Sequence, residues 1–222
     1  MKILSFDVGI KNLAFCLLDT ENNTIDDWGI LNICTSPVCD HQMKHRKCDN
    51  TAKKIVKDTD IKLCLSHTKL KQHKDKKFRN VPKHVNPMLE QGKKIVEKLD
   101  EKPDFLNVDI VLIENQPALK NPTMKSIQML LYSYFIIEGV CKDPICSNVQ
   151  MINARNKLKV YKGPEVECKF TDKYKKNKYL SVEYTKLMIL EEDQEFIDLF
   201  TESKKKDDLA DAYLQGIYFI EK

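Results

Sequence analysis

Acidic residues stand at three places in the chain where their positions suit catalysis or metal binding. Asp7 closes one apolar, strand-like run, and Glu114 closes another. Asp208 and Asp211 open the last helical segment, where their spacing places both side chains on one side of a helix. A carboxylate at the end of a buried strand is costly unless it is neutralised, and a divalent cation held by several carboxylates does this.

Oxygen ligands of this kind select Mg²⁺ or Mn²⁺ rather than zinc or copper. Two such ions about 3.5–4 Å apart would activate a water and stabilise the leaving oxygen of a phosphodiester. Two structural explanations compete with this one. Strand-end acids often form salt bridges, and acids in a first helical turn suit the helix dipole, which accounts for Asp208 but not for Asp7 or Glu114.

A second set of metal-binding residue types lies in a polar, basic stretch without hydrophobic periodicity. The spacing predicts four zinc ligands, of which the close pair at the end is the strongest part: Cys39, Cys48, Cys64 and His67. Thiolates and imidazole select zinc, and four protein ligands make a closed structural site that would fold a segment with little apolar core. Cys34 could replace Cys39, and His41 or His45 could compete. The alternative is a flexible loop with unliganded thiols.

The net charge of +4 hides an uneven distribution. Residues 34–84 hold 14 lysines and arginines against five aspartates, so the rest of the chain is acidic. A basic segment of this kind is typical of a surface that binds a polyanion, although a solvated lysine-rich loop has the same composition. A second basic stretch, 154–178, holds nine lysines and arginines against three acids.

Hydrophobic periodicity predicts the elements that must position the acids. Three antiparallel strands are expected at 3–7, 13–18 and 24–33, a buried parallel strand at 108–114 and another strand at 149–152. Helices are expected at 87–99, 122–140 and 179–190, and over the C-terminal segment that begins near Lys206. The fold class is therefore α/β, with a mixed five-stranded sheet, flanking helices and a small zinc-binding insertion at 34–77 in one domain of 1–222.

Composition excludes several classes of protein. With 222 residues, 42% of them hydrophobic and 32% charged, the chain is expected to be a soluble globular protein. It has no apolar run approaching the roughly 20 residues of a membrane span and no secretory signal pattern, so we expect a cytoplasmic protein without a membrane partner. Its eight cysteines are then more typical of metal ligands and core residues than of disulfides.

Three motifs occur in order along the chain: Asp7-Val-Gly-Ile-Lys-Asn-Leu-Ala14, then Ile113-Glu-Asn-Gln-Pro117 followed by Met124-Lys-Ser-Ile127, then Lys206-Asp-Asp-Leu-Ala-Asp-Ala212. Together they resemble the motifs of RuvC-like Holliday junction resolvases, in the branch of poxviruses and other large cytoplasmic DNA viruses. The resemblance implies an RNase H-like fold, a homodimer, and two-metal hydrolysis of paired phosphodiesters in a four-way DNA junction. It also implies a viral replication site in the host cytoplasm.

Carried onto this chain, the resemblance assigns the catalytic acids to Asp7, Glu114, Asp208 and Asp211, which would hold two Mg²⁺ or Mn²⁺ ions per active site. Gln116 would contact the substrate or orient a carboxylate, unless it is simply a turn residue. The helix at 122–140 resembles the element that builds the dimer interface.

The insertion is absent from the RuvC pattern, so its role is our own hypothesis. Zinc would make a rigid platform that displays basic residues to the phosphates of a junction arm: Lys44, Arg46, Lys47, Lys53 and Lys54. The other candidate DNA contacts are Lys11, Gln116, Lys125 and Lys205. The competing functions are another RNase H-like nuclease, such as one that cuts RNA–DNA hybrids, and a zinc-dependent nucleic-acid-binding protein without catalysis.

Overall fold

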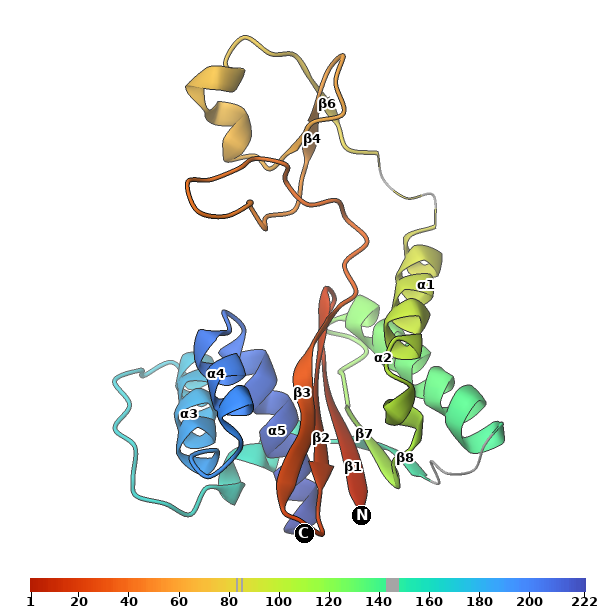
Figure 1. Ribbon diagram of the computed structural model, residues 1–222, viewed down its shortest axis with the longest axis vertical. Helices are drawn as coiled ribbons and strands as arrows, with labels where there is room; N and C mark the ends of the chain where they lie inside the picture. Colours follow the sequence, from red (N-terminus) through yellow and green to blue (C-terminus); the bar gives the residue numbers. More distant parts are fainter. Residues whose placement is uncertain (83, 85, 143–147) are drawn as a thin grey trace. The chain divides into compact units, whose positions relative to one another are not determined.

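A five-stranded mixed sheet with the strand order β3-β2-β1-β7-β8 is the centre of the larger of two structural units (Figure 1). Its strands are β1 (Lys2–Val8), β2 (Asn12–Asp19), β3 (Thr24–Asn32), β7 (Ile110–Glu114) and β8 (Asn148–Ile152). The first three form an antiparallel meander, whereas β7 is parallel to both β1 and β8. The predicted mixed five-stranded sheet is confirmed.

The computed structural model describes residues 1–82, 84, 86–142 and 148–222. The larger unit comprises Met1–Ile33 and Ile95–Lys222, and the smaller unit comprises Cys34–Lys94. The insertion predicted at 34–77 lies inside the smaller unit.

Helices cover both faces of the sheet because its central strands are apolar on both sides (Figure 1). Alternate residues of β2 belong to different apolar clusters. Leu13, Phe15 and Leu17 pack with α1 (Pro87–Asp100) and α2 (Pro122–Tyr134). Ala14, Cys16 and Leu18 pack with α3 (Lys173–Met188), α4 (Gln194–Glu202) and α5 (Lys206–Ile220).

The helices differ from the predicted ones in three ways. The helix expected at 122–140 changes at Phe135 into a π-helical stretch, Phe135–Cys141, which keeps Phe135 and Gly139 facing the core. Helix α3 begins six residues before the predicted start, because the Asp172 side chain caps it by accepting a hydrogen bond from the Lys175 backbone N–H at 2.9 Å. Helix α4 was not predicted.

The smaller unit contains a short three-stranded sheet that hydrophobic periodicity did not predict. Its order is β5-β4-β6, with β4 at Lys54–Val56, β5 at Lys62–Leu63 and β6 at Phe78–Asn80. Three of the five residues in its buried cluster are cysteines, namely Cys39, Cys48 and Cys64. A core this small offers little hydrophobic stabilisation to a unit of this length.

Among the helices that the structure describes, none has the length and apolar character needed to cross a membrane.

Candidate active site

The central parallel strands place two of the predicted acids next to each other. Phe6 and Ile113 are the last paired residues of β1 and β7, so the residues that follow them, Asp7 and Glu114, lie at the carboxyl ends of adjacent strands. Ligands and reacting groups gather at such strand ends in α/β folds. The sequence placed both acids at strand ends, and the register makes them neighbours.

Helix α5 brings Asp211 to the same place. Gln215 on this helix is buried, and its side-chain amide donates hydrogen bonds to Ser5 Oγ and to the Phe6 carbonyl oxygen, both at 3.1 Å. These bonds fix α5 against β1. Because Asp211 lies one helical turn before Gln215, its carboxylate is held near the end of β1.

The three carboxylates interact electrostatically. Burial, followed by the charge of Glu114 and a hydrogen bond with it, raises the pKa of Asp7 well above its usual value. Burial also raises the pKa of Asp211, although the neighbouring Lys157 ammonium opposes the shift. Acids that repel one another in a partly buried site are stabilised by a cation, so these residues fit the divalent metal that their oxygen chemistry predicts.

The fourth predicted acid has a different partner. Asp208 forms an ion pair with Lys205 at 3.2 Å in the first turn of α5. Lys205 was predicted to contact DNA, and its ammonium is paired here with the carboxylate of Asp208.

Gln116 orients Glu114. This residue is buried, and its side-chain amide donates a hydrogen bond to Glu114 Oε2 at 2.8 Å. Its backbone N–H donates to Gln128 Oε1 at 2.9 Å, and Lys125 Nζ donates to that same oxygen at 3.2 Å and to Asn115 Oδ1 at 3.1 Å. Of the two functional roles predicted for Gln116, the geometry supports the positioning of a carboxylate.

Basic residues from the segment after β8 share the cleft with the acids. A hollow of about 280 Å³ is lined by Glu114, Asp211, Arg155, Lys157 and Lys178, among others. The Lys157 ammonium lies 2.6 Å from Asp211 Oδ2. Sequence reasoning noted the excess of positive charge at 154–178 but named none of these residues, because only the fold brings them to the acids.

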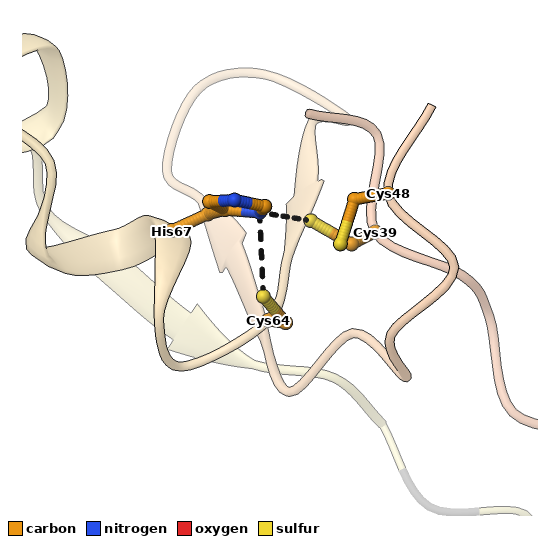
Figure 2. Close-up of side chains that lie close together, drawn as sticks. All are labelled: Cys39, Cys48, Cys64 and His67. Carbon is orange, nitrogen blue, oxygen red and sulfur yellow. Dashed lines mark hydrogen bonds between the residues drawn. The ribbon is translucent and has the colours of Figure 1, made fainter. Parts of the chain in front are cut away.

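The four predicted zinc ligands converge in the smaller unit (Figure 2). The ligand atoms of Cys39, Cys48, Cys64 and His67 all lie within 4.8 Å of one another. His67 Nδ1 is 3.3 Å from Cys39 Sγ and 3.4 Å from Cys64 Sγ. A 3₁₀ turn, in which the His67 backbone N–H donates to the Cys64 carbonyl oxygen at 3.1 Å, brings the last two together.

The structure also shows the contacts of Cys34 and His41, two of the alternative zinc ligands. Cys34 Sγ is 3.8 Å from the Ser36 carbonyl oxygen. The ring of His41 packs against that of His67, tilted by 37° with centroids 4.0 Å apart, and its Nδ1 lies 3.3 Å from Gln72 Nε2. Cys39 is therefore the residue that completes the Cys₃His cluster.

The basic residues predicted to contact DNA have varied surroundings in the smaller unit. Arg46 pairs with Asp49 at 3.1 Å, and Lys47 pairs with Asp40 at 3.3 Å. Lys53 and Lys54 line a cleft of about 550 Å³ inside this unit. Lys44 is exposed in the smaller unit, as Lys11 is in the larger one.

Comparisons with known proteins found similar sequences and similar structures. A protein of Acanthamoeba polyphaga mimivirus, uncharacterized protein L451, is 28% identical over 311 aligned residues that cover all of this chain and 75% of the relative. The yeast mitochondrial Holliday junction resolvase Ydc2 superimposes with a TM-score of 0.52 at 16% identity, covering 97% of this chain and 77% of that one. The fowlpox virus resolvase, solved with Holliday junction DNA, gives a TM-score of 0.47 at 19% identity over 100% and 97% of the two chains.

The likeness to the yeast enzyme supports the RNase H-like resolvase fold that the sequence motifs implied. The family model described as "Mitochondrial resolvase Ydc2 / RNA splicing MRS1" matches residues 3–118, a stretch that contains both Asp7 and Glu114. Because that match spans more than half of the chain, the protein belongs to the Ydc2 resolvase and MRS1 splicing family.

Proposed function

We propose that this protein is a Holliday junction resolvase, an endonuclease that cuts phosphodiesters symmetrically in four-way DNA junctions. The observation that carries the proposal is the convergence of Asp7, Glu114 and Asp211 at the carboxyl ends of the central strands, in a chain of a resolvase family. A mimivirus relative supports the predicted viral setting, for which we propose a replication site in the host cytoplasm.

The carboxylates would hold two Mg²⁺ or Mn²⁺ ions, which when bound supply an activated water and stabilise the leaving oxygen. Asp7 interacts electrostatically with both Glu114 and Asp211, so it would hold metal together with each of them. Gln116 keeps the Glu114 carboxylate in one orientation. The Lys157 ammonium offsets the charge of Asp211. Because Lys157 also lines the cleft, it would attract a DNA phosphate that binds there. Asp208 would join this set if a metal ion replaced Lys205 as its partner.

The Cys₃His cluster would hold a structural zinc ion. Three thiolates and one imidazole are typical zinc ligands, and four protein ligands leave no open position for catalysis. Zinc would then contribute most of the folding free energy of the smaller unit and support the basic residues that face a junction arm.

The substrate suggests a homodimer, because a four-way junction presents two equivalent strands. Helix α2 and the π-helical stretch after it expose apolar side chains at Met129, Ile137 and Val140. This is the element that the resemblance assigned to the dimer interface. A two-fold axis there would place one active site on each of two strands.

The test is a cleavage assay with labelled substrates: an immobile four-way junction, a linear duplex, an RNA–DNA hybrid and a structured RNA, each with and without Mg²⁺. We expect symmetric cuts near the branch point that require Mg²⁺. Asp7→Asn should abolish cutting and leave junction binding intact. Asp198→Asn, which alters an exposed acid on α4, is the matched control and should cut normally.

The same panel tests two other functions. Cleavage of the hybrid alone would identify a different RNase H-like nuclease and contradict our proposal. The family description also names an RNA-splicing protein, so RNA binding is a second candidate function. Tight binding of the structured RNA without cleavage of any substrate would favour it.

A further inference from the structure

The proposed function leaves the second basic stretch, 154–178, largely without a role. Its last part forms the start of α3, where four of the first six residues are lysines. Lysines in a first helical turn are unfavourable because they face the positive end of the helix dipole. The first turn of α3 contains no acid, and the capping residue before it, Asp172, supplies one negative charge against four lysines. Helix stability therefore does not explain this charge, which suggests a ligand.

A groove of about 780 Å³ lies beside this helix start. Four lysines line this groove: Lys175 and Lys178 on α3, Lys204 in the loop before α5, and Lys206 at the first position of α5. Two acids, Asp207 and Glu202, also line it, but Asp207 forms an ion pair with Lys178. The groove is therefore net positive.

The groove adjoins the active-site cleft. Lys178 lines both hollows, so the groove lies beside the cleft that contains Glu114 and Asp211. A strand that enters the cleft to be cut has a positively charged path away from it.

Exposed aromatic rings lie along the same path. Tyr174 lines the cleft and is 67% exposed, and Lys178 Nζ lies 5.2 Å from the centre of its ring. Phe170 lines the groove, is 45% exposed, and packs its ring against Tyr179 with centroids 5.6 Å apart. Alternating lysines and exposed rings are what proteins use to bind unpaired nucleic acid, because every base has a face that can stack.

We propose that this groove binds the DNA strand that leaves the active-site cleft, with the groove lysines on its phosphates and Tyr174, in the neighbouring cleft, stacked on a base that is unpaired at the branch point. The inference rests on the proposed function and deepens it by adding a surface that binds single-stranded DNA. The occupant is an unpaired strand rather than a duplex, because a stacking ring requires a free base face.

The first test measures junction affinity in an Asp7→Asn background, so that no cutting interferes. Tyr174→Ala should weaken binding at least about fivefold, since stacking on an aromatic side chain contributes about that factor or more per base. Tyr174→Phe retains the ring and should bind like the parent. A 2-aminopurine placed next to the scissile phosphate should change its fluorescence on binding to the parent but not to Tyr174→Ala.

The second test measures salt dependence. Lys175→Ala/Lys204→Ala should lower the slope of log affinity against log salt concentration by about 0.7 for each single-strand phosphate that a lysine no longer neutralises. Lys98→Ala is the matched control, because Lys98 lies on α1, across the sheet from α3. Its slope should equal that of the parent.

The outcomes separate the two proposals. If the unsubstituted protein binds and cuts junctions but the Tyr174 and lysine variants keep the affinity and slope of their Asp7→Asn parent, the groove inference is wrong and the resolvase function stands. If the parent neither binds nor cuts junctions, both are wrong. A change in oligomeric state with unchanged DNA affinity would assign the groove to a protein interface and overturn the inference.

Discussion

At the scale of single residues, the active site depends on side chains that hold other side chains in place. Gln215 fixes α5 against β1, Gln116 orients Glu114, and Lys157 offsets the charge of Asp211. None of them is an acid, yet each sets the position or charge of one. Substituting them should therefore alter catalysis without removing any of the proposed metal ligands.

Gln116→Ala should lower the cleavage rate by about 10- to 100-fold, the usual effect of removing a partner that orients a metal ligand. Junction affinity should stay unchanged, because the Gln116 side chain is buried against Glu114. Single-turnover cleavage and a binding titration measure the two quantities. Gln194→Ala, at an exposed glutamine on α4, is the control and should have no effect. A loss of binding equal to the loss of rate would instead make Gln116 a DNA-binding residue.

Lys157→Met should destabilise the larger unit in metal-free buffer by about 1–3 kcal/mol, because Asp211 would keep a partly buried charge without its partner. Adding Mg²⁺ should reduce this loss, since a bound cation replaces the missing ammonium. Urea unfolding followed by tryptophan fluorescence suits this measurement. The only tryptophan of the chain is Trp28, which is buried against Phe200 in the larger unit. Equal destabilisation with and without Mg²⁺ would contradict the prediction.

At the scale of elements, the strand ends and the turn beside them position the acids. The turn after β1 brings the chain back toward itself, and the Gly9 N–H donates to the Asn12 carbonyl oxygen at 3.0 Å. A side chain at this position would meet that oxygen, because a Cβ added to Gly9 would lie 2.7 Å from it. The chain's own backbone therefore approaches this glycine too closely to leave room for a side chain.

Gly9→Ala should lower the free energy of unfolding by about 1–3 kcal/mol, the usual cost of forcing extra atoms into a packed site. It should also slow cleavage, because the turn begins two residues after Asp7. Urea unfolding and single-turnover cleavage are the measurements. Ile10→Ala changes an exposed residue of the same turn and should shift stability by less than about 0.5 kcal/mol. Equal stability of both variants would show that the turn can relax around the added carbon.

At the scale of the whole molecule, the two units hold opposite charge and use different sources of stability. The larger unit has two apolar clusters, one on each face of its sheet. The smaller unit has one small cluster made largely of cysteines. Removing the metal should therefore affect them unequally.

Cys64→Ser should lose the bound zinc and make Cys34–Lys94 sensitive to protease, while Trp28 fluorescence and urea unfolding of the larger unit stay unchanged. Metal content and limited proteolysis are the measurements. The control is Cys34→Ser, whose thiol lies by the Ser36 carbonyl oxygen and which should keep full zinc content. Equal zinc content in Cys64→Ser and the parent would rule out this ligand set.

Much of this structure was predictable from local sequence. Alternating or continuous apolar runs predicted the five strands, because strand periodicity reflects burial on a pleated surface. The spacing of Cys64 and His67 predicted their pairing, because one short turn joins them. Helix α4 was missed although Asp193, a residue type common at helix starts, occupies its N-cap position. Its short length left too few periodic positions.

The sequence by itself determined which residues could hold metal and which elements would support them. Residue type settles ligand chemistry, and periodicity settles strand or helix. Only the tertiary structure decided that Lys157 meets Asp211 and that the lysines of α3 and α5 share a groove. The physical reason is separation along the chain. Interactions between residues that are far apart in sequence depend on strand register and helix packing, which no local pattern encodes.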